Sequence, residues 1–178
     1  MVVSAARHTP PVPTYEIDSE QTRFEMGTRP GIPGLSVRIS GVTGSFEATF
    51  VDGAVDLTQP VHGEFAMHVD ELRAGNAFVT AGVRQWLGRE DGTAVRGEVT
   101  EVRARDDRRY DLLMRIHLLD RTVPLKGTGR VAIRPTGPIE ATGVTMCDPR
   151  AFGVPLPPLL NLMVHVRWRI VLTEAPAP

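Results

Sequence analysis

The histidines are the residues of this sequence best suited to hold a metal ion. His62 and His68 are six positions apart, which places both on one face of a β-strand, opposite Phe65. Glu64 and Asp70 share that face and would complete an oxygen–nitrogen metal site. The same spacing is also typical of an ordinary solvated strand face. We adopt this second interpretation and expect no metal and no cofactor.

The remaining reactive groups form no catalytic motif. Cys147 is the single cysteine, so no internal disulfide can form, and a nucleophilic role would require a nearby histidine base. The sequence contains no G-x-S-x-G elbow, no H-E-x-x-H motif and no phosphate-binding glycine loop. We therefore expect a non-enzymatic protein with no catalytic residue. The alternative is a small-molecule lyase or cyclase with an inward acid–base pair, such as Arg150 with Tyr15 or Tyr110.

Large apolar side chains recur on one face of many segments and are the candidate ligand-binding groups. Apolar sites with few polar anchors favour long hydrophobic ligands, because burial of apolar surface drives binding without directional bonds. The alternative is that these side chains simply fill a core. The candidates are Phe24, Met26, Phe46, Phe50, Phe65, Met67, Phe78, Trp86, Met114, Leu156, Leu159, Leu160, Met163 and Trp168.

The elements that position these residues are predicted to be β-strands. Apolar and polar residues alternate most clearly over residues 110–118, 123–133 and 164–172, and again around Phe24, Phe65 and residues 95–99. Gly, Pro and Asp separate the segments, which is typical of a sandwich or barrel. Strands of this length span roughly 30 Å at about 3.3 Å per residue. About eight of them would close a barrel with room for side chains or one slim ligand.

Three segments interrupt this alternation. Residues 76–88 have apolar residues at helical spacing, with Asn76 as an N-cap and Gly88 as a stop, so we predict a short helix there. Residues 154–163 are apolar but broken by proline and cannot form a central strand. They form either a loop closing the barrel mouth, against a ligand, a membrane surface or a partner subunit, or a buried connector. Residues 106–109 are expected to form a charged hairpin turn.

Length and charge narrow the remaining possibilities. The chain has 178 residues, which suits a single domain over residues 14–174, with an extended leader at 1–13 and a tail at 175–178. Twenty basic residues balance 21 acidic ones, and the arginines are dispersed, so no nucleic-acid partner is expected. No apolar run is long enough for stable membrane insertion. The N-terminus shows no signal-peptide pattern, so we expect a cytoplasmic protein.

Several short motifs occur in an order shared with a known family. They are Tyr15-Glu16-Ile17-Asp18, Val42-Thr43-Gly44-Ser45-Phe46, Gly75-Asn76 before the predicted helix, Thr122-Val123-Pro124-Leu125 and Asp148 to Val154. Together they cover roughly residues 14–174. In this order the chain resembles the YceI-like family of lipocalin-like barrels, which are associated with polyisoprenoid binding. Gln21-Thr22 stands where the family has His-Ser, so the chain resembles a divergent member.

The resemblance implies an all-β protein, an extended antiparallel lipocalin-like barrel of about eight strands. It also implies a binding or carrier protein for a long apolar ligand such as an isoprenoid lipid or quinone, and a possible homodimer. An interaction or stress-response scaffold with a filled barrel remains an alternative beside the lyase or cyclase. We expect any ligand entrance near residues 76–87 or 154–163.

Overall fold

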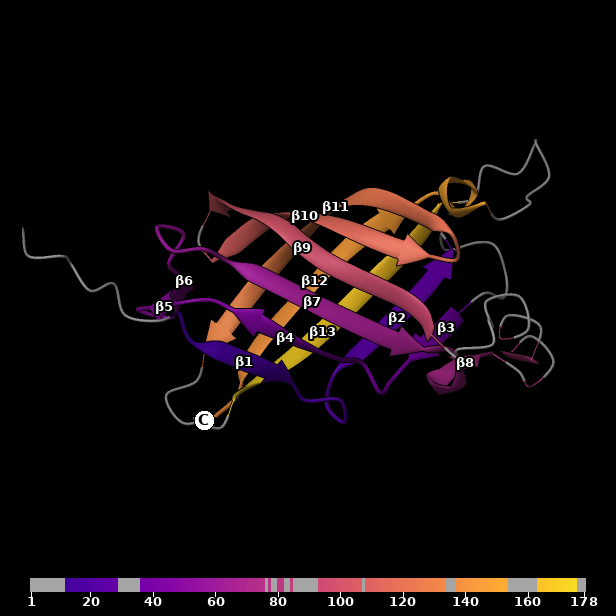
Figure 1. Cartoon of the computed structure of the whole chain (residues 1–178), viewed down its shortest axis with the longest axis horizontal. Coiled ribbons are helices and arrows are strands. Elements are labelled where there is room, and N and C mark those ends of the chain that lie inside the picture. The colour runs from indigo at the N-terminus through magenta and orange to yellow at the C-terminus, as the bar shows by residue number, and fades with distance from the viewer. Residues whose placement is uncertain are drawn as a thin grey trace, which may run out of the picture.

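An antiparallel β-barrel of eight strand lines makes up nearly all of the structure (Figure 1). The computed structural model describes residues 12–28, 36–75, 77, 80–81, 84, 93–106, 108–133, 137–153 and 163–175. The main sheet closes because the first strand pairs with the last, β1 (Thr14–Ile17) with β13 (Val164–Glu174). The predicted all-β barrel is confirmed.

One wall of the barrel consists of five long unbroken strands, each paired antiparallel with the next. They are β9 (Thr93–Asp106), β10 (Arg109–Leu118), β11 (Arg121–Ile133), β12 (Ile139–Cys147) and β13. The strands predicted from alternation all lie in this wall or in β2 and β7, and the predicted turn joins β9 to β10. Within that turn Arg108 has a positive φ of 54°, which non-glycine residues adopt mainly in tight turns.

The opposite wall consists of three strand lines, each broken once. They are β1 with β2 (Arg23–Thr28), β3 (Ser36–Ile39) with β4 (Thr43–Glu47), and β7 (His62–His68) with β8 (Leu72–Ala74). The register shows that each pair forms one line: β13 pairs with both β1 and β2, while β4 pairs with β1 and β3 pairs with β2. Counted this way, the barrel has eight antiparallel lines that follow one another in chain order.

Side-chain hydrogen bonds maintain the backbone where the first line breaks. Asp18 Oδ1 accepts hydrogen bonds from the amides of Glu20 and Gln21, both at 3.0 Å, and Oδ2 accepts one from Gln21 Nε2 at 2.6 Å. The Gln21 bonds lower the pKa of the Asp18 carboxyl. Oγ1 of the fully buried Thr22 accepts a hydrogen bond from the Val171 amide at 3.0 Å. In an unbroken strand a backbone carbonyl would accept this bond. Of the pair Gln21-Thr22, Thr22 thus completes the sheet and Gln21 holds the Asp18 turn.

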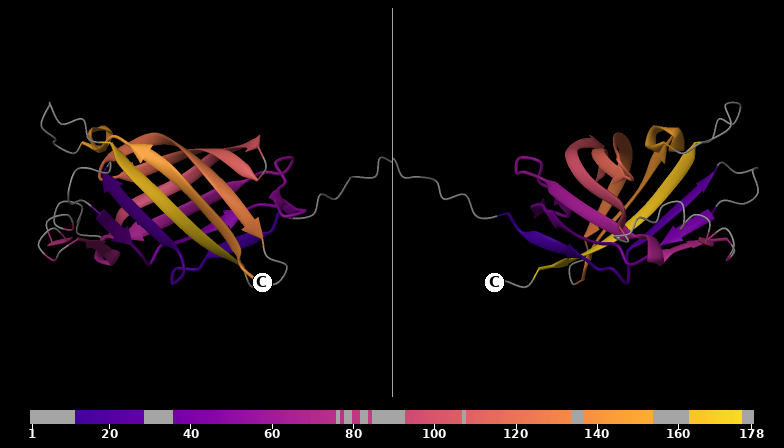
Figure 2. Two further views of the ribbon diagram at one scale, coloured as in Figure 1. Left: turned by 180° about the vertical axis from the view of Figure 1, so that it is seen from behind. Right: turned by 45° about the vertical axis from the view of Figure 1, so that its right-hand side comes forward.

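Different elements lie at the two ends of the barrel. The small hairpin of β5 (Phe50–Val51) and β6 (Ala54–Val55) lies at one end, and the 3-10 helix η2 (Pro149–Phe152) lies at the other (Figure 1). Near η2 the β11–β12 ladder stops at the Gly127–Thr145 pair, and the β10–β11 hairpin curves away from β12 (Figure 2). A second 3-10 turn, η1 (Val69–Glu71), separates β7 from β8.

The predicted helix and the predicted mouth loop lie largely outside the described residues. Of residues 76–88, the structure describes Ala77, Thr80, Ala81 and Arg84 as helical. Of residues 154–163 it describes only Met163. Within the described parts of the chain, no helix has the length and apolar character needed to cross a membrane.

Candidate functional site

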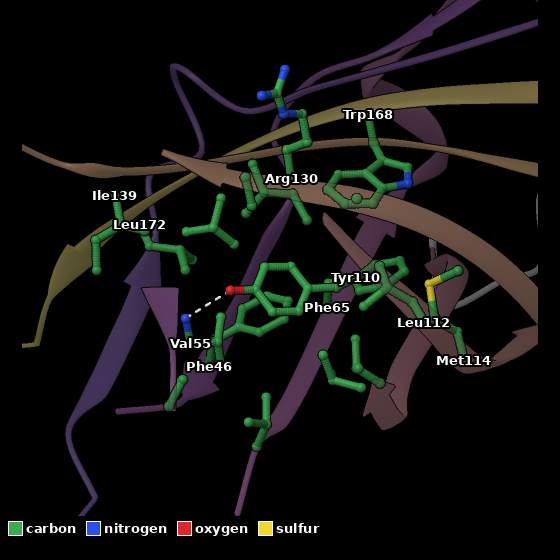
Figure 3. A pocket seen from close by; sticks show the side chains of 18 of the residues that line it. Phe46, Val55, Phe65, Tyr110, Leu112, Met114, Arg130, Ile139, Trp168 and Leu172 are labelled. Carbon is green, nitrogen blue, oxygen red and sulfur yellow. Dashed lines mark hydrogen bonds between the residues drawn. The ribbon is translucent and has the colours of Figure 1, made fainter. Parts of the chain in front are cut away.

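An apolar cavity of about 100 Å³ lies inside the barrel, between the continuous and the interrupted wall (Figure 3). Among the described residues that line it, Arg130 is the only charged one. This residue is exposed, and its guanidinium points away from the other labelled side chains. The other lining residues are Phe24, Phe46, Ala48, Phe50, Val55, Val61, Phe65, Val99, Val102, Tyr110, Leu112, Met114, Gly129, Val131, Ile139, Ala141, Trp168, Ile170 and Leu172.

Glycines on the inward face allow aromatic rings to lie against the barrel wall. A Cβ at Gly97 would lie 2.1 Å from Cζ of Phe65, and one at Gly143 would lie 2.1 Å from Cζ2 of Trp168. Both distances are far shorter than van der Waals contact, so these rings can occupy their positions only over glycine. The rings therefore lie along the wall, beside the cavity.

Two aromatic pairs mark different levels of the interior. Phe24 and Phe65 have ring centroids 5.6 Å apart at a tilt of 35°. Tyr15 and Phe50 form an edge-to-face pair at 5.4 Å, near the β5–β6 hairpin. Both separations fall in the range where aromatic pairs attract. Burial, with a smaller contribution from the nearby charge of Glu174, raises the pKa of Tyr15, so its phenol is neutral at physiological pH.

Tyr110 attaches the β5–β6 hairpin to the end of the barrel. Its Oη accepts a hydrogen bond from the Val55 amide at 2.9 Å, and the side chain is buried (Figure 3). This bond joins the continuous wall to a hairpin that lies outside the main sheet. The hairpin therefore covers this end of the cavity.

The structure brings together six of the predicted ligand-binding residues and separates others. Phe24, Phe46, Phe50, Phe65, Met114 and Trp168 line the cavity. Met67 is buried and Met26 half-buried in the adjoining core, away from the cavity lining, and the half-buried Met163 precedes β13. Phe78, Trp86, Leu156, Leu159 and Leu160 lie outside the described residues.

Other lining residues were not among the candidates, although a signal for some of them exists. Tyr110, Leu112 and Leu172 lie on the predicted apolar faces of their strands, so alternation alone would have found them. Val55 and Val61 flank irregular segments, where no period of two marks the inward face.

The candidate acid–base pairs of the enzyme alternative are not formed. Arg150 follows Cys147, which pairs with the first residue of β13, whereas Tyr15 pairs with Glu174 at its last residue. That length of strand separates the two by roughly 30 Å. Tyr110 directs its hydroxyl toward Val55, at the end of the barrel away from Arg150.

The histidines considered as metal ligands lie on the outside of the barrel. His62 and His68 are both exposed on β7. Within the described residues, no three His, Cys, Asp or Glu side chains come together in a group that could hold a metal ion.

Comparison with known proteins gives similarity in structure alone. No protein-family model matches the chain, and no curated protein matches it in sequence. The structure of BcnA from Burkholderia cenocepacia superimposes with a TM-score of 0.69 at 11% identity, covering 88% of this chain and 99% of that one. A polyisoprenoid binding domain from Saccharophagus degradans, implicated in plant cell wall breakdown, gives 0.64 at 12% identity, covering 93% and 99%. This chain therefore has the lipocalin-like barrel fold that its resemblance to the YceI-like family predicted.

Proposed function

We propose that this protein binds a long apolar molecule, such as an isoprenoid lipid or a quinone, inside its barrel and carries it without chemical change. The observation that carries the proposal is the cavity itself, whose lining is apolar apart from the outward-pointing Arg130. Its fold neighbour from Saccharophagus degradans is described as polyisoprenoid-binding, which supports the same class of ligand.

Burial of apolar surface would supply the affinity. At about 25 cal/mol per Å², an apolar ligand that buries roughly 200 Å² of its own surface would gain about 5 kcal/mol. The residues around the cavity offer few polar partners, so the site would select for hydrophobicity and shape. The separation of Arg150 from both tyrosines is the reason to favour a carrier over a lyase or cyclase.

A long ligand requires a wider lumen than this structure has. The cavity of about 100 Å³ is smaller than the roughly 300–1,000 Å³ of sites for drug-sized ligands. Phe46 and Phe50 are half-buried, and Phe50 belongs to the two-residue strand β5, outside the main sheet. Movement of these two rings would extend the cavity toward the β5–β6 end.

The test begins with protein purified without detergent. Native mass spectrometry, followed by solvent extraction, should release a stoichiometric isoprenoid, quinone or similar lipid. The same spectra report the oligomeric state, for which the family resemblance suggests a homodimer. Release of no ligand, together with failure of the emptied protein to take up a prenylated probe, would favour the filled-barrel scaffold.

A matched pair of variants locates the binding site. Ala141 faces the cavity from β12, and Ala141→Phe should fill the void and abolish uptake of the prenylated probe. Val144 lies on the same strand but is 48% exposed, so Val144→Phe should leave uptake unchanged. Equal uptake by the two variants would place the ligand elsewhere.

A further inference from the structure

Among the described residues, three buried side-chain atoms have no hydrogen-bond partner: Nε1 of Trp168, Oγ1 of Thr145 and Nε2 of His165. His165 lies on the opposite face of β13 from Trp168, so only the first two belong to the inner wall. Trp168 is 9% exposed and Thr145 is 5% exposed. Native proteins rarely leave buried polar groups unpaired, because such groups lose their bonds to water and gain nothing in return. These two atoms therefore require a separate explanation.

The two side chains are neighbours on the inner wall. Gly143 is paired with Trp168 and Thr145 with Val166, so Thr145 and Trp168 are diagonal across β12 and β13. Residues in this relation have Cβ atoms roughly 7 Å apart or slightly closer. A single small group between them can therefore reach both.

The orientation of the indole places its N–H on the side of Thr145. The six-membered ring covers Gly129 and Gly143, while the nitrogen lies on the side of Met114 and away from Ile139 (Figure 3). The ideal Cβ position of Gly127 is 2.5 Å from Oγ1 of Thr145 and 3.1 Å from the methyl group of Met114. The Thr145 hydroxyl thus lies beside Met114, in the direction that the indole nitrogen faces.

These polar atoms lie at one boundary of the apolar cavity. Trp168 and Met114 line the cavity, whereas Thr145 lies just beyond its lining, at the end of the β11–β12 ladder and on the wall of a second, open pocket that also includes Lys126. From Trp168 the cavity extends to Leu172, four residues along β13 or roughly 13 Å at 3.3 Å per residue. An apolar tail in the cavity would point toward the β5–β6 hairpin, with its other end beside Trp168 and Thr145.

The available chemistry identifies the group that fits there. An indole N–H is a donor only, and a threonine hydroxyl both donates and accepts, so an oxygen acceptor can bind both donors. Arg130 beside the cavity points outward, and the basic residues of the second pocket, Arg103, Arg105 and Lys126, are exposed. An anion buried between the two donors would therefore lack a charged partner, which is very unfavourable. A buried water with two to four polar partners is the competing occupant, and the experiment below distinguishes it from a ligand oxygen.

We propose that Trp168 Nε1 and Thr145 Oγ1 donate hydrogen bonds to one uncharged oxygen of the ligand, a carbonyl or a hydroxyl, while the apolar tail fills the cavity. This inference rests on the proposed function and adds the end group that the site recognises. It excludes a carboxylate or diphosphate from this position.

The experiment compares four probes that share one short prenyl chain. They carry a benzoquinone, a hydroxyl group, a diphosphate or a ring hydrocarbon without oxygen. Trp168→Phe and Thr145→Val each remove one donor and keep the shape, so each should weaken quinone or alcohol binding by roughly fivefold to tenfold. Hydrocarbon binding should not fall. Thr142→Val, on the outward face of β12, is the matched control and should change nothing.

Infrared spectroscopy of the bound quinone gives a readout that packing defects do not reproduce. Its carbonyl stretch should lie at lower frequency in the wild-type complex than in the double variant Trp168→Phe/Thr145→Val. The variants should also be at least as stable as wild type without ligand, because each removes an unpaired polar atom. A clear loss of stability in Thr145→Val would reveal a structural partner and overturn the inference.

The outcomes distinguish this inference from the proposed function. Equal binding of all probes to wild type and variants would mean that a water molecule, or nothing, meets the two donors, while the apolar site stands. Tight binding of the diphosphate probe alone would overturn the proposed recognition of an uncharged oxygen by Trp168 and Thr145. Binding of none of the four probes would overturn the proposed function itself.

Discussion

The two walls of this barrel are stabilised by different means. The continuous wall, β9 to β13, has strands of 9 to 14 residues joined by long backbone ladders. The interrupted wall has pieces of 3 to 7 residues, with breaks at similar levels in all three lines. Near those breaks lie its most deeply buried apolar residues, Val42 at 0%, Leu72 at 1% and Ile39 at 2% exposed.

The difference shows where each wall can accept a loss of packing. Backbone pairing is sufficient within unbroken stretches of strand for inward positions to be glycine, as at Gly97, Gly127 and Gly143 of the continuous wall and at Gly63 inside β7. That leaves space for rings and for the cavity. The interrupted wall lacks this pairing at its breaks, so it depends on side-chain packing and on the Thr22 hydrogen bond. A cavity beside the breaks would be costly.

The largest expected effect tests packing in the interrupted wall. Leu72→Ala should lower the free energy of unfolding by about 2–5 kcal/mol, because it opens a cavity in fully packed surroundings. Leu112→Ala in the continuous wall should cost less, since Leu112 is half-buried beside an existing cavity. Urea denaturation followed by circular dichroism measures both. Leu57→Ala, at an exposed position, is the control. If Leu112→Ala lowered the free energy of unfolding as much as Leu72→Ala does, the two walls would not differ in this respect.

The next effect tests the glycine positions of the continuous wall. Gly97→Ala should cost about 1–3 kcal/mol through overpacking, because its three nearest contacts are atoms of the Phe65 ring. Phe65→Leu in the same chain should recover part of that loss, which a double-mutant cycle detects. Gly75→Ala, with nothing within 4 Å of the added carbon, should be close to neutral. Additive losses from Gly97→Ala and Phe65→Leu would contradict this account.

A similar or smaller effect is expected at the break between β1 and β2. Thr22→Val should cost about 1–3 kcal/mol, because it leaves the buried amide of Val171 without an acceptor. Thr22→Ser retains the hydroxyl and should retain most of the stability. Amide hydrogen exchange at Val171 should accelerate in the valine variant alone. Unchanged exchange would show that the hydroxyl does not protect the ladder.

The smallest effect concerns Cys147, at the end of β12. Burial raises the pKa of its thiol to about 11, and the charge of Asp148 acts in the same direction. A thiol in the unfolded chain has a pKa of about 8.5, so between that pH and 11 the unfolded chain loses a proton that the folded protein keeps. The folded protein should therefore lose stability as the pH rises through this range. Cys147→Ala should remove that part of the pH dependence. Alkylation by iodoacetamide should be slow at pH 8, and rapid reaction there would contradict the burial.

The same difference between the walls explains what the sequence could predict. Alternation identified β10, β11 and β13 because their inward residues are mostly large and apolar over nine or more positions. It missed β12, whose inward residues include Gly143 and Thr145, small or polar groups that weaken the pattern. In the broken lines alternation identified β2 and β7 around Phe24 and Phe65, whereas the shorter pieces β1, β3, β4 and β8 have too few residues for a clear period of two.

The candidate site was predictable in part for a related reason. Inward aromatic residues such as Phe24 and Trp168 could be selected by size and parity. Whether they leave a void depends on which glycine faces which ring across the barrel. The strand registers determine these pairings, and the registers cannot be read from residue types alone. The unpaired atoms of Trp168 and Thr145 depend on the same registers.

Closure of the barrel has a consequence for the order of its strands along the chain. Every line pairs with its neighbour in sequence except at the seam between β1 and β13, where the amide of Ala175 also donates to the carbonyl of Thr14 at 3.1 Å. A short linker joining residues 14 and 175 would make this seam a hairpin like the others. New termini in the turn between Asp106 and Arg109 would then give a circular permutant that preserves every pairing.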